Sequence, residues 1–387
     1  MKTMTAFTFE IDDPEAAAAE ILEQIDIKGL GKSSLGILTC YTNFIDSGAV
    51  QTICEALPFD VIGMTTVGTV SSVALGEMAL GLLVLTSDDV DFIVGAVGIT
   101  GGDVDGPVCK AYEETSAKRP GQPVMALVFA PYIPGVVGES IAVSLDKASG
   151  GIPIFGSLAI DSSIVDFSFN RTIYNGEACE KKLVFALLYG DLRPSFFVTS
   201  FTEDKIQKQR GIVTKSKDNI LMEVNNMPLL DYLQSLGIQK TEGAWTMSLF
   251  PFVLDYNDGT KPVVRSVFLI TKEGYAACGG YIPENATLSV GGIDYPNIIR
   301  TTSEALEQIL TKKKDDGGSC LLMFSCLGRY FALESHTTAE METIRDILMD
   351  FPGYLFGYSG GEICPVYTEE GRAVNRFHNC TFIVCLL

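Results

Sequence analysis

The sequence predicts an α/β protein with mixed sheets, in which repeated β-α-β-β units form two packed halves and helices cover the sheets. Three observations predict it. Hydrophobic residues make up 47% of the 387-residue chain, enough for a large buried core. Short apolar runs of strand length alternate with helix-like stretches, and this alternation recurs three times. In each recurrence the second apolar run ends in a Gly-containing turn, after which a third strand returns antiparallel.

The three units share one order of elements, namely strand, helix, strand and closing strand. The third helix is the clearest, because Met341, Ile344 and Leu348 fall at helical spacing and Glu340 lies in the first turn. The four elements are expected, in this order, at 35–42, 48–57, 59–70 and 79–86 in the first unit. In the second unit they are expected at 123–130, 136–148, 151–161 and 182–191, and in the third at 319–329, 338–350, 353–363 and 381–387.

The region between the second and third units has a different pattern. Residues 211–238 indicate a hairpin followed by a helix, three short strands are expected within 263–292, and a helix over 302–313 leads into the third unit. We therefore predict two domains, 1–195 and 196–387.

Composition excludes several classes of function. The formal net charge of −20 argues against a nucleic-acid partner. The start of the chain lacks the pattern of a signal peptide, and no apolar run approaches the roughly 20 residues of a membrane span. Ten cysteines form no CxxC pair, and there are only two histidines. We therefore expect a cytoplasmic protein that has no membrane association, no metal site and no cofactor.

The Gly-containing turns are the first candidate site. Ligands of α/β sheets commonly lie beyond the carboxyl ends of parallel strands, where glycine lets a ligand approach and Ser/Thr hydroxyls and backbone N–H groups bind anions. The other interpretation is that these are only tight turns, since none matches a Rossmann or P-loop fingerprint. The candidate ligand-binding residues in the three turns are Thr65, Thr66 and Gly68; Ser157 and Asp161; and Tyr358, Ser359, Gly361 and Glu362.

Cys326 and Arg329 are the second candidate. Arg329 is expected to end an apolar strand, so its charge needs either an acidic partner, for which Glu362 is the obvious residue, or a ligand carboxylate. An enzyme using Cys326 as nucleophile is an alternative, although such a nucleophile needs a base and histidine is scarce. A haem sensor with His378 as axial ligand is a further alternative.

Four segments together resemble the FIST family in unbroken order. They are 57–72 with a G-x-S/T-x-x-G signature, 151–192, 263–290 with Arg265, and 326–366 with its Cys-x-x-Arg and Gly-Glu-Ile turn. One departure is Thr69, which stands where the family signature usually continues with Glu. The resemblance implies a sensory, signal-transducing domain that binds a small ligand, with amino acids the usual suggestion and haem in some members.

The two FIST halves consume the chain and leave no recognisable output domain. We therefore expect a small-ligand-binding sensory protein that has no catalytic residues, that binds an amino acid or similar metabolite between its halves, and that signals through a partner protein in trans.

Overall fold

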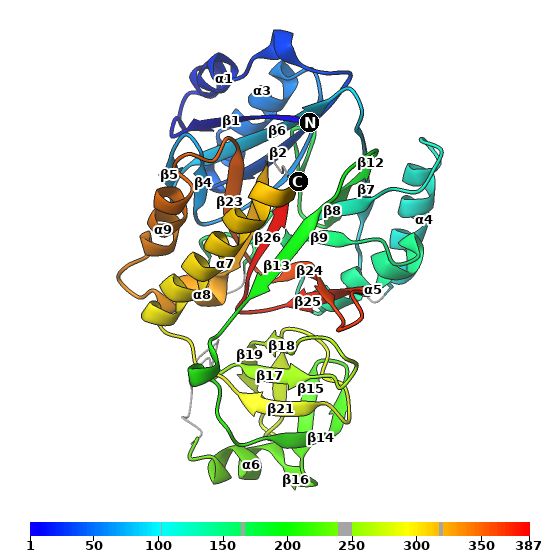
Figure 1. Cartoon of the computed structure of the whole chain (residues 1–387), viewed down its shortest axis with the longest axis vertical. Helices are drawn as coiled ribbons and strands as arrows, with labels where there is room; N and C mark the ends of the chain where they lie inside the picture. The colour runs from blue at the N-terminus through cyan, green and yellow to red at the C-terminus, as the bar shows by residue number, and fades with distance from the viewer. Residues whose placement is uncertain (102, 164–166, 239–249, 317–319) are drawn as a thin grey trace.

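Three copies of one structural unit build the body of the molecule (Figure 1). The computed structural model describes residues 1–101, 103–163, 167–238, 250–316 and 320–387. Repeat 1 consists of β1 (Lys2–Thr8), α1 (Pro14–Glu23), β2 (Ser33–Cys40), α2 (Asn43–Asp46), α3 (Ala49–Ala56), β3 (Asp60–Thr65), β4 (Thr69–Ser71), β5 (Leu75–Gly76) and β6 (Leu80–Ser87). Repeat 2 consists of β7 (Asp91–Gly98), α4 (Asp105–Ser116), β8 (Met125–Ala130), α5 (Gly138–Ser149), β9 (Ile154–Leu158), β10 (Thr172–Tyr174), β11 (Glu177–Cys179) and β12 (Lys182–Tyr189).

Repeat 3 has the same plan but is interrupted by an insertion. It consists of β13 (Ser195–Thr199), α7 (Tyr295–Asp316), β22 (Leu321–Cys326), α8 (Leu327–Ala332), α9 (Ala339–Ile347), β23 (Tyr354–Ser359), β24 (Glu362–Tyr367), β25 (Ala373–His378) and β26 (Phe382–Leu386). The insertion, residues 203–290, separates β13 from α7 and is called the cap below.

Each repeat forms a mixed sheet whose last two strands come from another repeat. In all three sheets two parallel strands lie beside an antiparallel closing strand, as in the pairs β2–β3, β8–β9 and β22–β23. The hairpin β4–β5 of repeat 1 pairs with β23 of repeat 3. In the same way β10–β11 of repeat 2 pairs with β3, and β24–β25 of repeat 3 pairs with β9. The exchange of hairpins therefore closes a ring of three.

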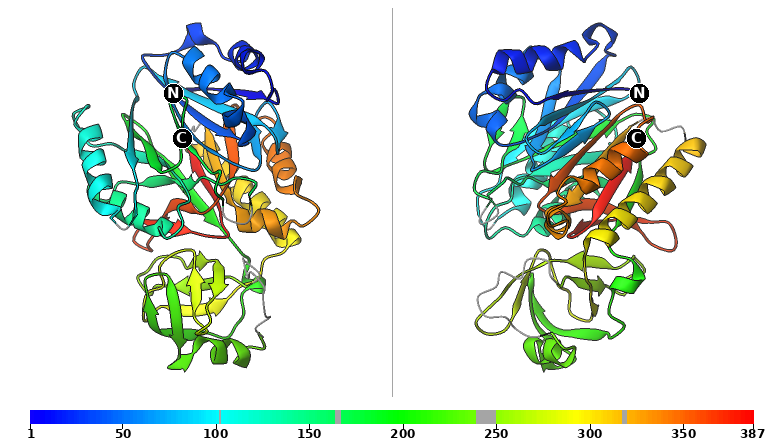
Figure 2. Two further views of the ribbon diagram at one scale, coloured as in Figure 1. Left: turned by 180° about the vertical axis from the view of Figure 1, so that it is seen from behind. Right: turned by 90° about the vertical axis from the view of Figure 1, so that its left-hand side faces the viewer.

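The three sheets enclose one shared core, and helices cover their outer faces (Figures 1 and 2). In this core the ring of Phe324 lies 5.7 Å from those of Phe129 and Phe155, so side chains of repeats 2 and 3 meet. Gly63 and Gly156 allow the parallel strands to pack closely, because a Cβ atom there would lie 2.0 and 1.9 Å from a carbonyl oxygen of the neighbouring strand. Burial of this apolar surface is the main force that stabilises the body.

The cap is a small β unit that lies at one end of the body (Figure 1). Its own apolar core includes Val213, Leu233, Phe252 and Leu288. It contains η2 (Glu203–Lys205), β14 (Gly211–Lys217), β15 (Ile220–Val224), β16 (Met227–Pro228), α6 (Leu229–Ser235), β17 (Phe252–Asp255), β18 (Val263–Arg265), β19 (Val267–Ile270), β20 (Ala276–Cys278) and β21 (Thr287–Val290).

The structure confirms the predicted mixed α/β class and the three β-α-β-β units. Each unit is larger than expected, because an edge strand and a helix (β1 and α1, β7 and α4, β13 and α7) precede its four predicted elements. Of these, α7 contains the helix that was predicted over 302–313. The predicted strand 319–329 is wrong at its end. It ends at Cys326, and Arg329 belongs to helix α8, while residue 319 lies outside the described residues.

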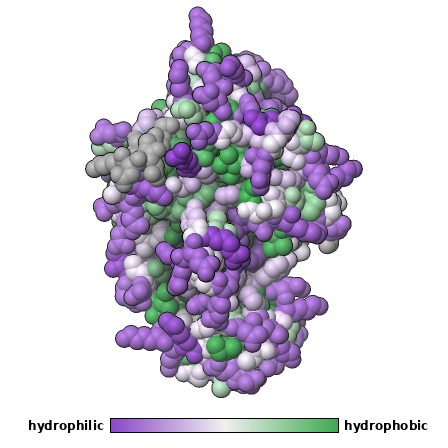
Figure 3. Space-filling model, turned by 45° about the vertical axis from the view of Figure 1, so that its right-hand side comes forward, coloured by the Kyte–Doolittle hydropathy of each residue, from purple (hydrophilic) through white to green (hydrophobic). Residues whose placement is uncertain are grey.

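The surface is mainly hydrophilic. In Figure 3 hydrophilic residues cover most of the visible face and hydrophobic residues appear in small groups. Among the described helices, none has the length and apolar content needed to cross a bilayer.

Candidate functional site

The three Gly-containing turns meet one another at one end of the shared core. The Thr66 hydroxyl donates to the Tyr358 carbonyl at 2.9 Å and so joins the turns of repeats 1 and 3. The N–H of Ile160 donates to the Thr65 carbonyl at 3.2 Å, and the N–H of Leu158 donates to the Gly361 carbonyl at 2.9 Å. The turn of repeat 2 is therefore bonded to both others. The structure thus brings together residues that the sequence placed up to about 300 positions apart.

A buried polar cluster occupies this meeting point. We define the central cluster as Thr66, Thr69, Ser157, Cys326, Ser359, Glu362 and Thr381, all of which are buried. The Ser359 hydroxyl donates to one oxygen of Glu362 at 2.5 Å, and the Thr381 hydroxyl donates to the other at 2.7 Å. Burial nevertheless raises the pKa of Glu362 to about 8, because these hydroxyls do not offset the loss of hydration.

Cys326 lies beside Glu362 in the central cluster. A hydrogen bond with the thiol of Cys380 and burial together raise the pKa of the Cys326 thiol well above its usual range. Thiolate formation, which nucleophilic catalysis requires, is therefore disfavoured at this position. Neither histidine is a base for it: His336 stacks on Tyr295 at 4.9 Å, and the buried His378 uses its Nε2 for the Cys364 carbonyl at 3.1 Å.

Arg329 is paired with Glu340 and not with Glu362. Both side chains are fully buried, and the Arg329 guanidinium donates to Glu340 Oε1 at 2.7 and 3.1 Å. The expected partner was wrong because Arg329 lies in α8, which faces helix α9, where Glu340 begins the first turn. The guanidinium also donates to the hydroxyls of Ser325, Thr301 and Thr302 and to the carbonyl oxygens of Ser200 and Ile298.

The other predicted residues are buried at or near the same turns. Thr65 bonds to the backbone of Arg171, and the Asp161 carboxylate accepts the N–H of Ser163 at 2.5 Å. Tyr358 packs edge-on against Tyr330 and Phe356 on the outer face of its sheet, each at 4.9 Å. A Cβ at Gly361, where φ is 149°, would lie 2.3 Å from the ring of Phe377, and Gly68 accepts the Tyr358 N–H at 3.4 Å.

A second buried ion pair joins the cap to repeat 2. Arg265 of β18 is fully buried and donates to Glu139 Oε2 of α5 at 2.9 Å. The same carboxylate oxygen accepts the N–H of Tyr281 at 2.6 Å, so Glu139 holds two parts of the cap. Arg265 also donates to the Tyr256 hydroxyl at 2.6 Å and to the Phe377 carbonyl at 2.7 Å. Arg265 belongs to a segment that resembles the FIST family, but no local pattern indicates its partner Glu139, which lies 126 positions earlier.

An open cavity of about 660 Å³ lies between repeat 2 and the cap, next to this ion pair. Gly101, residues 103–105, the loop before α5 and one face of α5 form one wall. The β14–β15 turn and Tyr281 of the cap form the other wall. Its charged and polar lining residues are Asp103, Asp105, Ser140, Ser144, Lys147, Asp218, Asn219 and Tyr281, none of which was predicted from sequence as a ligand-binding residue.

The charges in this cavity are of both signs. Lys147 Nζ lies 2.5 Å from Asp105 Oδ2, and this contact lowers the pKa of Asp105 and raises that of Lys147. Asp218 of the cap lies close enough to Tyr281 to contribute to its raised pKa, of which burial is the largest cause. The cavity therefore presents an ammonium group on the repeat 2 wall and carboxylates on both walls.

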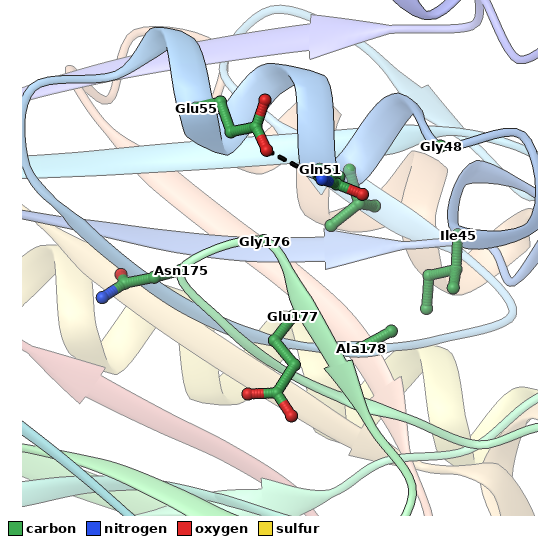
Figure 4. A pocket seen from close by; sticks show the side chains of 9 residues that line it. Ile45, Gly48, Gln51, Glu55, Asn175, Gly176, Glu177 and Ala178 are labelled. Carbon is green, nitrogen blue, oxygen red and sulfur yellow. Dashed lines mark hydrogen bonds between the residues drawn. The ribbon is translucent and has the colours of Figure 1, made fainter.

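Another hollow, of about 480 Å³, lies between α3 and the β10–β11 hairpin (Figure 4). Gln51 donates to Glu55 at 2.7 Å across one side of it. On the other side Asn175 donates to Asp60, and Glu177 is paired with Lys182. Its own charged lining residues are Glu55 and Glu177, so it offers no cation to a ligand carboxylate.

Comparison with solved structures gives a distant likeness. The crystal structure of a cyanuric acid hydrolase from A. caulinodans matches with a TM-score of 0.34 and 9% sequence identity, over 99% of this chain and 97% of that one. No curated protein matches the sequence.

Comparison with protein families gives a clear result. The FIST N domain model matches residues 34–227, about half of the chain, and the FIST C domain model matches residues 229–365. FIST domains are associated with sensory signal transduction and small-ligand binding. The chain belongs to the FIST family.

Proposed function

We propose that this protein is a sensor that binds an amino acid or similar small metabolite in the cavity between repeat 2 and the cap. The observation that carries the proposal is the lining of that cavity. The Lys147 ammonium suits a ligand carboxylate, and Asp103 and Asp218 suit a ligand ammonium. A cavity of about 660 Å³ has the volume of an ordinary small-molecule site.

The central cluster is the alternative location for the ligand. Its residues were predicted from sequence as the binding site, and the three turns do bring them together. Their polar side chains are buried and hydrogen-bonded within the protein, whereas the cavity is open to solvent. The cavity is therefore the favoured location, and the predicted contacts of Glu362 and Ser359 with a ligand stay a hypothesis.

The proposal includes a partner and a compartment. FIST domains are associated with signal transduction, so we propose that a bound ligand is reported to a separate signalling protein. Cytoplasmic location is proposed because the cysteines are thiols rather than disulfides and nine of them are buried.

Thermal shift measurements with the twenty amino acids, small carboxylates and haemin test the ligand class. A ligand present at 100 times its dissociation constant should add roughly 2.7 kcal/mol to the stability of the folded protein. The shift should disappear in Lys147→Ala and Asp218→Asn. It should persist in Lys110→Ala, a matched control in which the exposed lysine of α4 lies outside the cavity. A shift that survives both cavity variants would remove the cavity as the site, and a response to haemin alone would favour a haem sensor.

A further inference from the structure

The cap is joined to the body at two separate places of different kinds. On one side the chain leaves β13 and returns to α7, and these two connections are bonded together. Gly292 donates to the Lys205 carbonyl at 2.9 Å, Asn297 donates to the Thr202 hydroxyl at 2.7 Å, and Lys205 forms an ion pair with Asp294. These connections lie on the left of the junction in Figure 1, and α5 lies on its right. Figure 2, seen from behind, shows the same separation.

On the α5 side the cap and the body are joined by noncovalent contacts, without a covalent connection. The buried pair Glu139–Arg265 lies at the centre of these contacts. Near it, the Cys380 sulfur lies 3.1 Å from the Ser266 hydroxyl and packs with Val253 and Val264 of the cap in a small apolar group. Arg376 of β25 forms a further ion pair with Asp258 of the cap, and the Ser266 N–H donates to the Asn379 side chain at 3.4 Å. Most of these contacts are polar, and polar interfaces between parts of one chain allow relative motion. The covalent connections are thus suited to act as a hinge and the ion pair as a latch.

The proposed ligand cavity straddles the latched side. Ser140 and Ser144 follow Glu139 on α5, and Tyr281 in the opposite wall donates its N–H to Glu139. A ligand held by both walls binds only when the cap is docked, so by linkage it favours the docked state. This step rests on the proposed function, whereas the hinge and the latch do not.

We infer that the cap is a hinged lid, held against repeat 2 by the Glu139–Arg265 latch, and that a ligand in the adjacent cavity acts by favouring the closed state. The change presented to a partner is then the position of the cap. Cys380 reports on the closed state, because its thiol is fully buried between the body and the cap. Cys40 and Cys320 are equally buried but lie inside the body, so only unfolding exposes them.

The test measures alkylation of these three thiols by iodoacetamide in the full chain, residue by residue, with mass spectrometry. In the double variant Glu139→Gln, Arg265→Met, which removes both charges of the latch, Cys380 should react at least tenfold faster while Cys40 and Cys320 keep their native rates. The control variant Arg329→Met breaks a buried pair within the body and should accelerate all three thiols together. Equal acceleration of all three thiols in the latch variant, or no acceleration of Cys380, would overturn the lid.

A second experiment tests the hinged lid independently of the proposed function. An equimolar mixture of the twenty amino acids should slow the alkylation of Cys380 in the native protein and have no effect in the Lys147→Ala variant. If the latch variant opens as expected but the mixture leaves the native rate unchanged, the hinge and latch stand and amino-acid sensing is rejected. If the mixture binds, as judged by thermal shift, without slowing Cys380, ligand-favoured closure is rejected and binding stands.

Discussion

The two buried Arg–Glu pairs of this molecule differ in what surrounds them. Arg329–Glu340 lies within repeat 3, where α8 and α9 pack on one sheet, and both side chains have no exposed surface. Arg265–Glu139 has similar geometry but joins the cap to the body, which are also linked by the two chain connections and by surface contacts such as the Arg376–Asp258 ion pair. Removing one partner leaves a buried charge unpaired in both cases. Only at the interface can movement of the cap expose the unpaired charge to water. Breaking the two pairs should therefore change the free energy of unfolding by different amounts.

The largest effect is expected from breaking the inner pair. Arg329→Met leaves Glu340 buried without its cation and should lower the free energy of unfolding by about 3–5 kcal/mol, as measured by urea denaturation. The double variant Arg329→Met, Glu340→Leu should recover most of that loss, since it removes both charges. A loss below about 1 kcal/mol in the single variant would show that Glu340 is hydrated or protonated in the native protein.

Glu362 differs from Glu139 and Glu340, because its buried carboxyl group is bonded to hydroxyl groups instead of to an arginine. Its folded-state pKa of about 8 exceeds the ordinary value near 4.5, so the native state holds a proton that the unfolded chain releases. The stability that this group contributes is full below about pH 4.5 and is lost as pH rises through 8, by about 1.4 kcal/mol per pH unit. Glu362→Gln should therefore gain stability relative to the native protein between pH 5 and 8. A difference independent of pH would place the pKa of Glu362 in its ordinary range.

His378, directly opposite Glu362 in the β24–β25 pair, should behave in the reverse way. Burial lowers its pKa to about 3, so its contribution to stability is present above about pH 6.5 and is lost as pH falls toward 3. In His378→Gln the loss of stability on acidification from pH 6.5 to 4 should be smaller by roughly 1.4 kcal/mol per pH unit. An unchanged acid limb of the unfolding profile would contradict a buried neutral imidazole.

The interface pair should have a smaller effect on global stability. Arg265→Met should cost about 1–3 kcal/mol, because Glu139 regains water when the cap moves away. Circular dichroism at several urea concentrations would show the body unfolding near its native midpoint. A loss as large as that of Arg329→Met would mean that the cap and the body unfold as one unit.

The smallest change in stability is expected in the cavity. Lys147 and Asp105 both have largely exposed side chains, so Lys147→Ala should leave the free energy of unfolding nearly unchanged. Its effect should appear instead as loss of ligand-induced stabilisation. A large destabilisation without ligand would identify Lys147 as a structural residue.

The repeats were predictable because each leaves a local pattern. Runs such as residues 123–130 are long enough and apolar enough to be strands, and each is followed by a helix and a Gly-containing turn. The first strand of repeat 1 was missed because β1 mixes polar and apolar residues at a sheet edge, which gives a weaker signal than a continuous apolar run. The exchange of hairpins between repeats depends on pairings across about 110 to 290 positions, which no local pattern encodes. The division at 195/196 stays a prediction.

The candidate site was predictable only in part. The three turns could be found because glycine and hydroxyl residues follow buried strands. The partner of Arg329 could not be chosen, because Glu340 and Glu362 are both within reach along the sequence and only the helical position of Arg329 decides between them. The cavity was missed because its walls come from α5 and from a cap turn about 75 positions later, and neither segment is unusual alone.

Because the repeats exchange hairpins, damage to one repeat also destabilises its neighbours. Each sheet is completed by strands that belong to another repeat, so removal of a repeat leaves one neighbour without its edge hairpin and leaves the hairpin of the other neighbour without a sheet to pair with. A lesion in the hairpin β4–β5, for example, should first loosen β23 of repeat 3 rather than the repeat that encodes it. The three repeats are thus bound to persist or fail together, and such a chain can evolve by substitution and by insertion at its loops but not by losing a repeat.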